Sequence, residues 1–230
     1  MGATPVGRAA LRLRVMVRAL AVSDEEVAGL RTDAVRRLGV DVVVAAGDLP
    51  FDYLAELCDR TDRPGVLVPG NHDADLSGYR QHRGMWTRAG QPCPWPGPDG
   101  YVDADGRVVD VAGLRVAGLG GSVRYRPGPN QWTQAEQTRR ARRLVRAARR
   151  LRRRDGRDVD VLLTHAPPRA CGDREDGPHH GFDCLHDVIA ALRPGVLLHG
   201  HIHPHGEPVP DRRIGTTRVV NVVGRKVLEL

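Results

Sequence analysis

Five short apolar runs stand out in the pattern of hydrophobic and polar positions. Each run is rich in valine or leucine and is long enough for a strand buried on both faces. The runs cover residues 17–22, 41–46, 65–69, 159–163 and 194–198. Continuous apolar strands of this kind are typical of parallel sheets that carry helices on both faces. The pattern therefore predicts an α/β protein.

Helical periodicity lies between several of these runs. Apolar residues recur on one face after the first run, after the second run and before the fifth run, over residues 30–38, 54–58 and 182–192. Gly39 is placed to end the first of these helices, because glycine readily adopts the left-handed conformation of a helix C-cap. Pro194 ends the last one.

The longest helix is expected over residues 133–154. Thr133 and Glu136 form a capping box, and an intact apolar stripe follows. Ten arginines lie between 139 and 154. They form either the solvated face of an amphipathic helix or a basic surface that holds a polyanion such as a nucleic acid. Because the apolar stripe is intact, we favour the solvated face. The absence of aromatic residues between these arginines also weakens the case for single-stranded nucleic acid.

The region 74–130 interrupts the alternation of strands and helices. It contains a loop rich in proline and glycine and then a predicted hairpin over 107–119 that turns near Gly113. The residues after 217 alternate again as strands on either side of Gly224. These additional strands indicate a second sheet. Without an internal repeat or a clear linker, residues 1–230 are interpreted as one domain, with 1–13 as a poorly ordered N-terminal extension.

Composition and charge narrow the functional classes. The formal net charge is +7 and comes from arginine, which suits either a polyanion partner or a general preference for arginine. The four cysteines contain no C-x-x-C pair, so free thiols are expected, although Cys171 and Cys184 flank one loop and could pair. No apolar stretch approaches the ~20 residues of a membrane span, and arginines interrupt the only N-terminal apolar segment. We therefore expect a cytoplasmic protein without a membrane span.

Polar residues that can bind a metal follow each of the five apolar runs. In an open α/β sheet, ligands bind beyond the carboxyl ends of the strands, so these side chains are expected to converge at one end of the sheet. In chain order these residues are Asp24, then Asp48, then Asn71, His72 and Asp73, then His165, and finally His199, His201 and His203. Oxygen and imidazole donors without thiolates suit Mn, Fe or Zn, and this many donors suits two ions better than one.

The order of these motifs resembles the calcineurin-like metallophosphoesterase superfamily. The resemblance runs from about residue 14 to the C-terminus and depends most on GNHD at 70–73 followed by GHIH at 200–203. The stretches GDLPFDYL at 47–54 and GLGGS at 118–122 are similar to an uncharacterised prokaryotic branch of that superfamily. The resemblance implies a four-layer α/β/β/α sandwich with two mixed sheets.

The resemblance also implies a function and a role for each motif residue. It implies hydrolysis of a phosphomonoester or phosphodiester by a hydroxide that bridges two divalent ions. Asp48 would bridge the ions, Asp24 and His203 would bind one of them, and Asn71, His165 and His201 would bind the other. His72 would be the general acid or would stabilise the transition state. Arg124 and Arg126, which follow GLGGS, are candidate contacts for the phosphate. Loop 171–182 is expected to overhang the site. The histidines near it, His179, His180 and His186, either contact the substrate or, as we favour, lie on a solvated loop.

Two positions depart from the family pattern. Glu26 stands where the family usually has a histidine, so it either replaces that ligand or marks a weak first site; with Ser23 it also forms the S-x-x-E signature of a helix start. Phe51 stands where an aspartate usually orients the catalytic histidine, which leaves Asp52 or Asp73 for that task. These departures motivate an alternative, a catalytically weak metal-binding relative with a regulatory or nucleic-acid-binding role.

Overall fold

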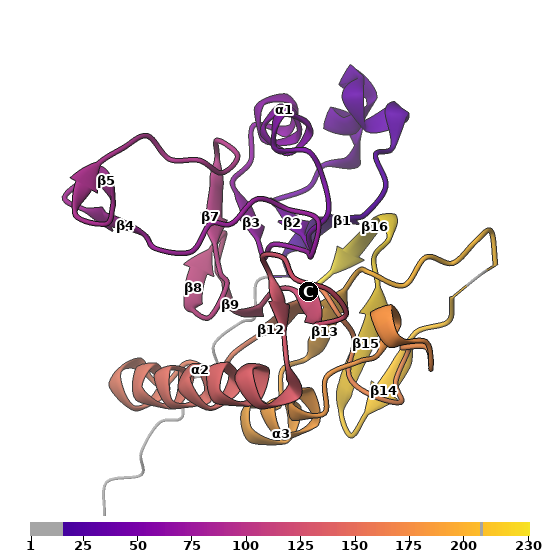
Figure 1. Ribbon diagram of the computed structural model, residues 1–230. Helices are drawn as coiled ribbons and strands as arrows, with labels where there is room; N and C mark the ends of the chain where they lie inside the picture. The colour runs from indigo at the N-terminus through magenta and orange to yellow at the C-terminus, as the bar shows by residue number, and fades with distance from the viewer. Residues whose placement is uncertain (1–15, 208) are drawn as a thin grey trace, which may run out of the picture.

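The computed structural model describes residues 16–207 and 209–230, so the expected N-terminal extension lies outside the described residues. Its centre is two sheets packed face to face, and helices cover the outer face of each sheet (Figure 1). This is the four-layer α/β/β/α arrangement with two mixed sheets that the family resemblance implies.

The first sheet has the strand order β16-β1-β2-β3-β7. Its strands are β1 (Arg18–Ser23), β2 (Val42–Ala45), β3 (Gly65–Leu67), β7 (Tyr101–Asp103) and β16 (Gly224–Glu229). The pairs from β1 to β7 are parallel, and β16 is antiparallel to β1. The C-terminal strand therefore closes the edge beside β1.

The second sheet has the strand order β14-β15-β13-β12-β9-β8. Its strands are β8 (Val108–Val111), β9 (Leu114–Leu119), β12 (Val161–Thr164), β13 (Val196–His199), β14 (Arg212–Ile214) and β15 (Thr217–Asn221). The four central strands are parallel, and β8 and β14 pair antiparallel at the edges. The predicted hairpin around Gly113 is the β8–β9 pair.

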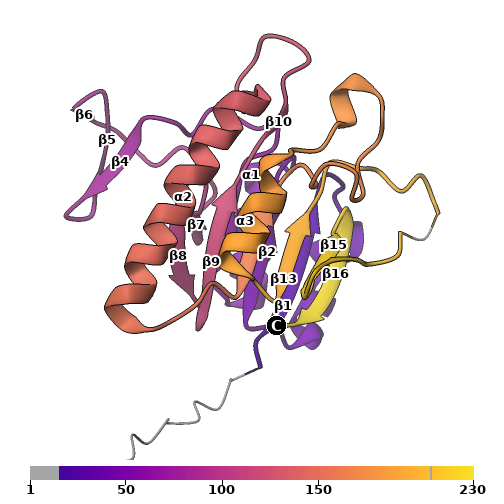
Figure 2. The ribbon, with the colours of Figure 1, turned by 90° about the horizontal axis from the view of Figure 1, so that it is seen from below.

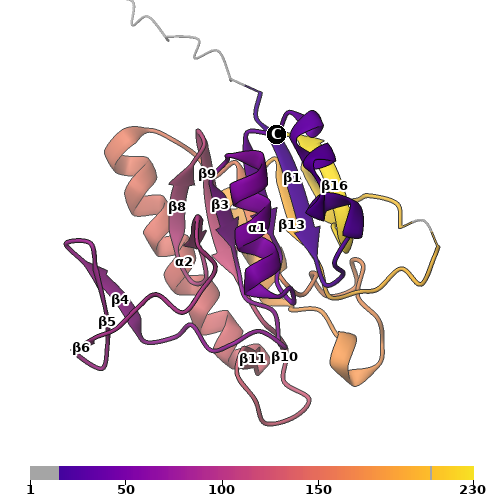
Figure 3. The same ribbon diagram turned by 90° about the horizontal axis from the view of Figure 1, so that it is seen from above.

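The helices divide between the two outer faces. The α1 helix (Phe51–Thr61) and two short 3-10 helices, η1 (Ala28–Arg31) and η2 (Asp33–Leu38), pack on the first sheet (Figure 3). The α2 helix (Gln134–Asp155) and the α3 helix (Cys184–Leu192) lie side by side on the second sheet (Figure 2). Apart from the first, which forms as η1 and η2, the predicted helices form close to their expected positions.

Successive side chains along each central strand pack alternately in the core between the two sheets and in the core under the helices. In β1, Ala19 and Ala21 pack between the sheets, whereas Leu20 and Val22 pack under α1 and the 3-10 helices. In β12, Leu162 packs against the helices of the second sheet and its neighbours face the other sheet. Successive side chains of a strand point to opposite faces, so a continuous apolar run serves two cores at once.

The α2 helix begins as its sequence predicts. The Glu136 amide donates to Thr133 Oγ1 (3.2 Å), and the Thr133 amide donates to Glu136 Oε2 (2.8 Å), which completes the capping box. Ala141, Leu144 and Ala148 are buried against the second sheet. Most of the arginines face outward, as expected for the solvated face of an amphipathic helix.

The segment after β1 differs from the prediction. The expected helix over 30–38 forms as the two 3-10 helices, because Thr32 adopts an extended backbone between them and caps the second with its side chain. Gly39 does end this segment in the left-handed conformation. The predicted cap by Ser23 and Glu26 is wrong. Ser23 is the last residue of β1 and donates to the Gly47 carbonyl, and no helix begins beside it.

Region 74–100 contains an unexpected element, the small lobe formed by β4 (Tyr79–His82), β5 (Met85–Arg88) and β6 (Gln91–Pro92). It extends away from the two main sheets (Figure 1). Trp86 and Trp95 stack on each other with ring centroids 4.3 Å apart, which gives this lobe an apolar centre of its own.

The structure also tests the predictions about cysteine pairing and about a membrane span. All four cysteines lie in the described residues as free thiols, so Cys171 and Cys184 do not pair. No helix in the described part of the chain combines the length and the apolarity that crossing a bilayer requires.

Asp103, at the end of β7, makes stability depend on pH. Burial raises the pKa of its carboxyl to about 6, and the hydrogen bond from the Asp105 amide and the charge of Arg107 offset this only in part. The folded protein therefore binds more protons than the unfolded chain between the ordinary pKa, 3.8, and about pH 6. We expect this contribution to the free energy of unfolding to be fully present below pH 3.8 and to be lost as the pH rises through 6.

Urea unfolding of wild type and Asp103→Asn between pH 4 and pH 7 tests this. The stability of the variant relative to wild type should rise by about 2 kcal/mol across that window, because a shift of one pKa unit corresponds to about 1.4 kcal/mol. Asp99→Asn, at an exposed position, is the matched control and should show no such trend. A difference between wild type and Asp103→Asn that does not change with pH would contradict the assignment.

Candidate metal centre

The predicted metal ligands follow strands of both sheets. Asp24, Asp48 and Asn71 follow β1, β2 and β3 of the first sheet, whereas His165 and His201 follow β12 and β13 of the second. The expectation that all five strands belong to one sheet is therefore wrong. The side chains still meet, because the carboxyl ends of both sets of parallel strands lie at the same edge of the sandwich.

Four of these residues form a compact cluster. Asp24, Asp48, His165 and His201 each offer one ligand atom, and these atoms all lie within 4.8 Å of one another. The two histidines are buried. Carboxylate and imidazole donors held this closely are the ligands that Mn, Fe and Zn accept.

Asn71 and His203 border the cluster. Asn71 is buried, and its Oδ1 lies 3.1 Å from His165 Nε2. His203 Nε2 lies 3.8 Å from Asp24 Oδ1. All six of the ligands first chosen from the motifs are thus close neighbours.

The two sheets are joined at this point by hydrogen bonds. The His201 amide of the second sheet donates to Asp24 Oδ2 of the first (2.8 Å). His165 Nδ1 lies 2.7 Å from the Ala46 carbonyl, which belongs to the loop after β2. The site is therefore part of the interface between the sheets.

Three of the cluster residues have a left-handed backbone. The φ angles are +60° at Asp24, +56° at Asp48 and +67° at His201. This conformation is uncommon outside glycine, and strained residues of this kind gather at functional sites. The neighbouring Gly200 is required for a different reason: a Cβ there would collide with Ser23 Oγ and Asp24 Oδ2.

Each of the three histidines has one ring nitrogen occupied by a partner outside the cluster. His165 Nδ1 is bound to the Ala46 carbonyl, His201 Nε2 lies 2.9 Å from the Pro178 carbonyl, and His203 Nδ1 lies 2.8 Å from Glu25 Oε1. Histidines that bind metals typically donate their second N–H to a carbonyl or carboxylate in this way. The residues present therefore fit a metal ion.

The electrostatics of the cluster favour a positive charge at its centre. Burial alone would lower the pKa of His165, but the adjacent charge of Asp48 raises it to about 9. Burial would likewise raise the pKa of Asp48, and His165 lowers it to about 2. Burial lowers the pKa of His201 to about 3, which keeps that ring neutral. Ionised carboxylates and neutral imidazoles are the forms that bind metals, so Asp48 and His201 already have the required form, whereas His165 would release one proton to an incoming ion.

Glu26 lies outside the cluster. Its carboxylate forms an ion pair with Arg31 at 2.6 Å and is 41% exposed. Glu25 approaches the site instead, because the chain turns sharply at Asp24. The expectation that Glu26 takes the place of a metal ligand does not fit this arrangement.

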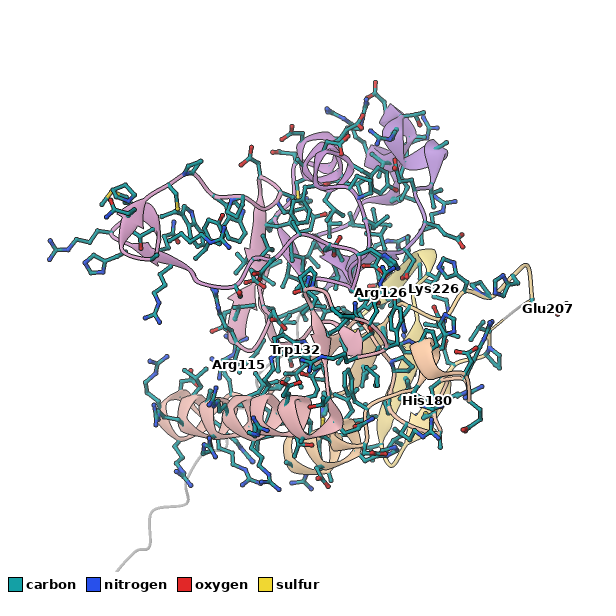
Figure 4. The ribbon with its side chains drawn as sticks, viewed as in Figure 1. Arg115, Arg126, Trp132, His180, Glu207 and Lys226 are labelled. Atoms are coloured by element: carbon teal, nitrogen blue, oxygen red, sulfur yellow. The ribbon has the colours of Figure 1, made fainter. Side chains whose placement is uncertain are left out.

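The two arginines chosen as phosphate contacts lie in different environments. Arg124 donates to Glu136 Oε2 (2.9 Å) and is bound to the start of α2. Arg126, labelled in Figure 4, stacks over Tyr125, and the Tyr125 hydroxyl accepts a 3.4 Å hydrogen bond from Asn71 Nδ2. Of the two, Arg126 is therefore connected to the site.

His72 lies at the entrance to the site. It is exposed, and its backbone amide donates to Asp48 Oδ1 at 2.8 Å. A cavity of about 380 Å³ adjoins it, lined by Asp48, Leu49, Pro50, Phe51, His72, Asp73 and Ala74. Asp48 of the cluster and His72 therefore line the same hollow.

Neither carboxylate expected to orient His72 does so. Asp52 is 79% exposed and lies 3.8 Å from Arg31. Asp73 Oδ2 accepts hydrogen bonds from the amides of Gly70 and Asp48, and so joins the two metal-binding loops. Asp73 is thus a structural residue of the site rather than a partner of the His72 ring.

Loop 166–182 contributes contacts that the motifs did not reveal. Besides the Pro178 carbonyl, the His179 ring lies 5.3 Å from the His201 ring, and Asp176 Oδ1 lies 2.6 Å from His179 Nδ1. His180, also in this loop, lies away from the cluster and contacts the Glu175 carbonyl (Figure 4). The loop expected to overhang the site is therefore in part a wall of it, and its contacts with His201 are what the sequence did not indicate.

Comparison with known proteins agrees with this fold. One solved protein superposes with a TM-score of 0.61 at 15% identity over 94% of this chain and 95% of its own. TT1561 of Thermus thermophilus gives 0.57 at 16% identity, over 91% and 90% of the two chains. A 5′-nucleotidase precursor from the same organism gives 0.42 at 14% identity, over 90% of this chain and 49% of that one. At these identities, the first two likenesses show the fold alone.

Comparison at the level of sequence identifies the family. No curated protein matches the chain. The family model described as calcineurin-like phosphoesterase matches residues 22–205, a segment that contains the whole cluster. The chain therefore belongs to the calcineurin-like phosphoesterase family.

Proposed function

We propose that this protein hydrolyses phosphoester bonds with two divalent metal ions. The observation that carries the proposal is the convergence of Asp24, Asp48, His165 and His201, from four strands of two sheets, within 4.8 Å. Family membership supports the reaction class, since the matched segment includes every one of these residues.

In this proposal, Asp48 holds both ions. Asp24 and His203 complete one site, and Asn71, His165 and His201 complete the other. The positions support this division, since Asp24 neighbours His203 and Asn71 neighbours His165. When bound, the ions would activate the attacking water and stabilise charge on the phosphoryl oxygens.

The residues around the cluster would position the substrate. His72 is exposed above the 380 Å³ cavity, where it can donate a proton or a hydrogen bond to the phosphoryl group or the leaving oxygen. The guanidinium of Arg126 can approach the same phosphoryl group from the side of Tyr125. Because no carboxylate among the described residues orients the His72 ring, we expect modest turnover rather than a highly efficient enzyme.

The decisive experiment is a screen of the metal-reconstituted protein. Protein loaded with Mn²⁺ should hydrolyse at least one substrate of a panel of chromogenic monoesters, chromogenic diesters, cyclic nucleotides and dinucleotides. Metal content measured on the same preparation should approach two ions per chain. Removing the metal with a chelator should abolish turnover, and added Mn²⁺ should restore it.

Two outcomes would contradict the proposal. Two bound ions without turnover on the whole panel would favour a metal-binding relative with a regulatory role. Turnover that survives complete removal of the metal would exclude the proposed chemistry.

A further inference from the structure

Glu25 is not one of the proposed ligands, but it contacts one of them, His203. Glu25 Oε1 lies 2.8 Å from His203 Nδ1, within hydrogen-bond distance. His203 Nε2 faces the other way, toward Asp24 Oδ1 at 3.8 Å. The histidine is therefore held between an outer carboxylate and an inner one.

The backbone places Glu25 in this position. The left-handed φ of +60° at Asp24 turns the chain immediately before Glu25, and the Glu25 amide donates to the Ser23 carbonyl. Opposite, Arg174 donates to the carbonyl of His203 at 2.7 Å. His203 is thus fixed through its ring on one side and through its backbone on the other.

The arrangement matters because the first metal site, as proposed, has one side-chain ligand fewer than the second. The adjacent carboxylate of Glu26 does not supply another, because it is bound to Arg31. Asp24, Asp48 and His203 remain as side-chain ligands. A carboxylate that accepts the outer N–H of a ligating histidine fixes its tautomer and raises the basicity of its inner nitrogen. A stronger imidazole donor can thus offset the missing one.

We propose that Glu25 is the positioning residue of the first metal site, acting through His203 to strengthen metal binding there. This inference rests on the proposed function, because it takes His203 as a ligand. It assigns different roles to two adjacent glutamates: Glu25 supports the metal site, and Glu26 belongs to a surface ion pair.

Mn²⁺ binding by the full-length protein tests the proposal, with free Mn²⁺ followed by electron paramagnetic resonance during a titration. Glu25→Ala should weaken the affinity of one of the two ions about 10- to 100-fold, the usual effect of losing such an outer partner, and leave the other within about threefold. The affinity of the Glu25→Gln variant for the same ion should lie between those of wild type and Glu25→Ala. Its amide oxygen still accepts the N–H of His203 but carries no charge. The thermal unfolding midpoint of the metal-free variants should stay close to that of wild type.

Glu26→Ala is the matched control and should leave both affinities unchanged. Equal affinities for wild type and Glu25→Ala would overturn the inference, as would an equal loss in Glu26→Ala. Wild-type protein that binds two ions but hydrolyses no substrate would overturn the proposed function alone, since the effect of Glu25 on affinity would still be measured. Wild-type protein that binds fewer than two ions would overturn both.

Discussion

Replacing Asp48 by asparagine is expected to lower kcat/KM by at least about 10³-fold, the upper end of the usual cost of losing a single electrostatic stabiliser in an active site. In the proposed site, Asp48 is the carboxylate that would hold both ions. It lies 3.3 Å from His165 Nε2 and also accepts the His72 amide. Asparagine keeps the shape and the amide contact but removes the negative charge. Steady-state kinetics on the substrate found in the screen, together with metal content, would measure the effect.

Asp52→Asn is the matched control for this experiment. It makes the same chemical change a short way further along the chain, at a side chain that is 79% exposed. We expect it to retain nearly all activity, which would also confirm that Asp52 does not orient His72. An Asp48→Asn enzyme with a tenth or more of the wild-type kcat/KM would contradict the bridging role.

Replacing Arg115 by alanine is expected to lower the free energy of unfolding by about 3 kcal/mol. Arg115 is 1% exposed and lies near the start of β9, beside the C-terminal end of α2 (Figure 4). Its guanidinium binds Asp110 at 3.0 and 3.1 Å, Asp155 at 2.9 and 2.8 Å, and the Arg157 carbonyl at 3.1 Å. One side chain therefore ties together β8, β9 and the end of α2.

Removing one partner of a buried ion pair typically costs about 3–5 kcal/mol, because the other charge is left uncompensated. The two aspartates keep some contact with water, 49% and 30% of their side chains being exposed, which places the expected loss at the lower end. Urea unfolding would measure it. Arg152→Ala removes an arginine whose ion pair with Asp158 is exposed and should cost less than about 1 kcal/mol. A loss for Arg115→Ala no larger than that control would refute the prediction.

Local patterns in the sequence determined most of the secondary structure. The five apolar runs become β1, β2, β3, β12 and β13, and α2 begins at the capping box of Thr133. These features depend on side-chain periodicity and on hydrogen bonds between residues close in the chain, which can be read without knowing the fold. The polar residues after each strand could be identified in the same way.

The family resemblance added a prediction of how these strands and helices are arranged in layers. The four layers and the two mixed sheets follow the expectation drawn from the motifs, and the family model confirms it. The apolar runs alone suggested a single sheet, because a strand that is buried on both faces looks the same whether a helix or a second sheet covers it.

Only the tertiary structure decided which of two neighbouring glutamates reaches the site. Glu25 and Glu26 are equally acidic, and spacing favoured Glu26. The backbone at Asp24 turns Glu25 toward His203 and leaves Glu26 to Arg31. Such a turn is imposed by contacts with the other sheet, including the bond from the His201 amide to Asp24.

The wall formed by loop 166–182 depends on the same kind of long-range contact. The Pro178 carbonyl holds His201 although 23 positions separate the two along the chain, and His179 packs beside the same ring. Periodicity and motif spacing describe what a segment can form by itself. They contain no information on which distant segment will pack against it. The candidate ligands could therefore be predicted from the sequence, whereas the residues that contact them required the folded structure.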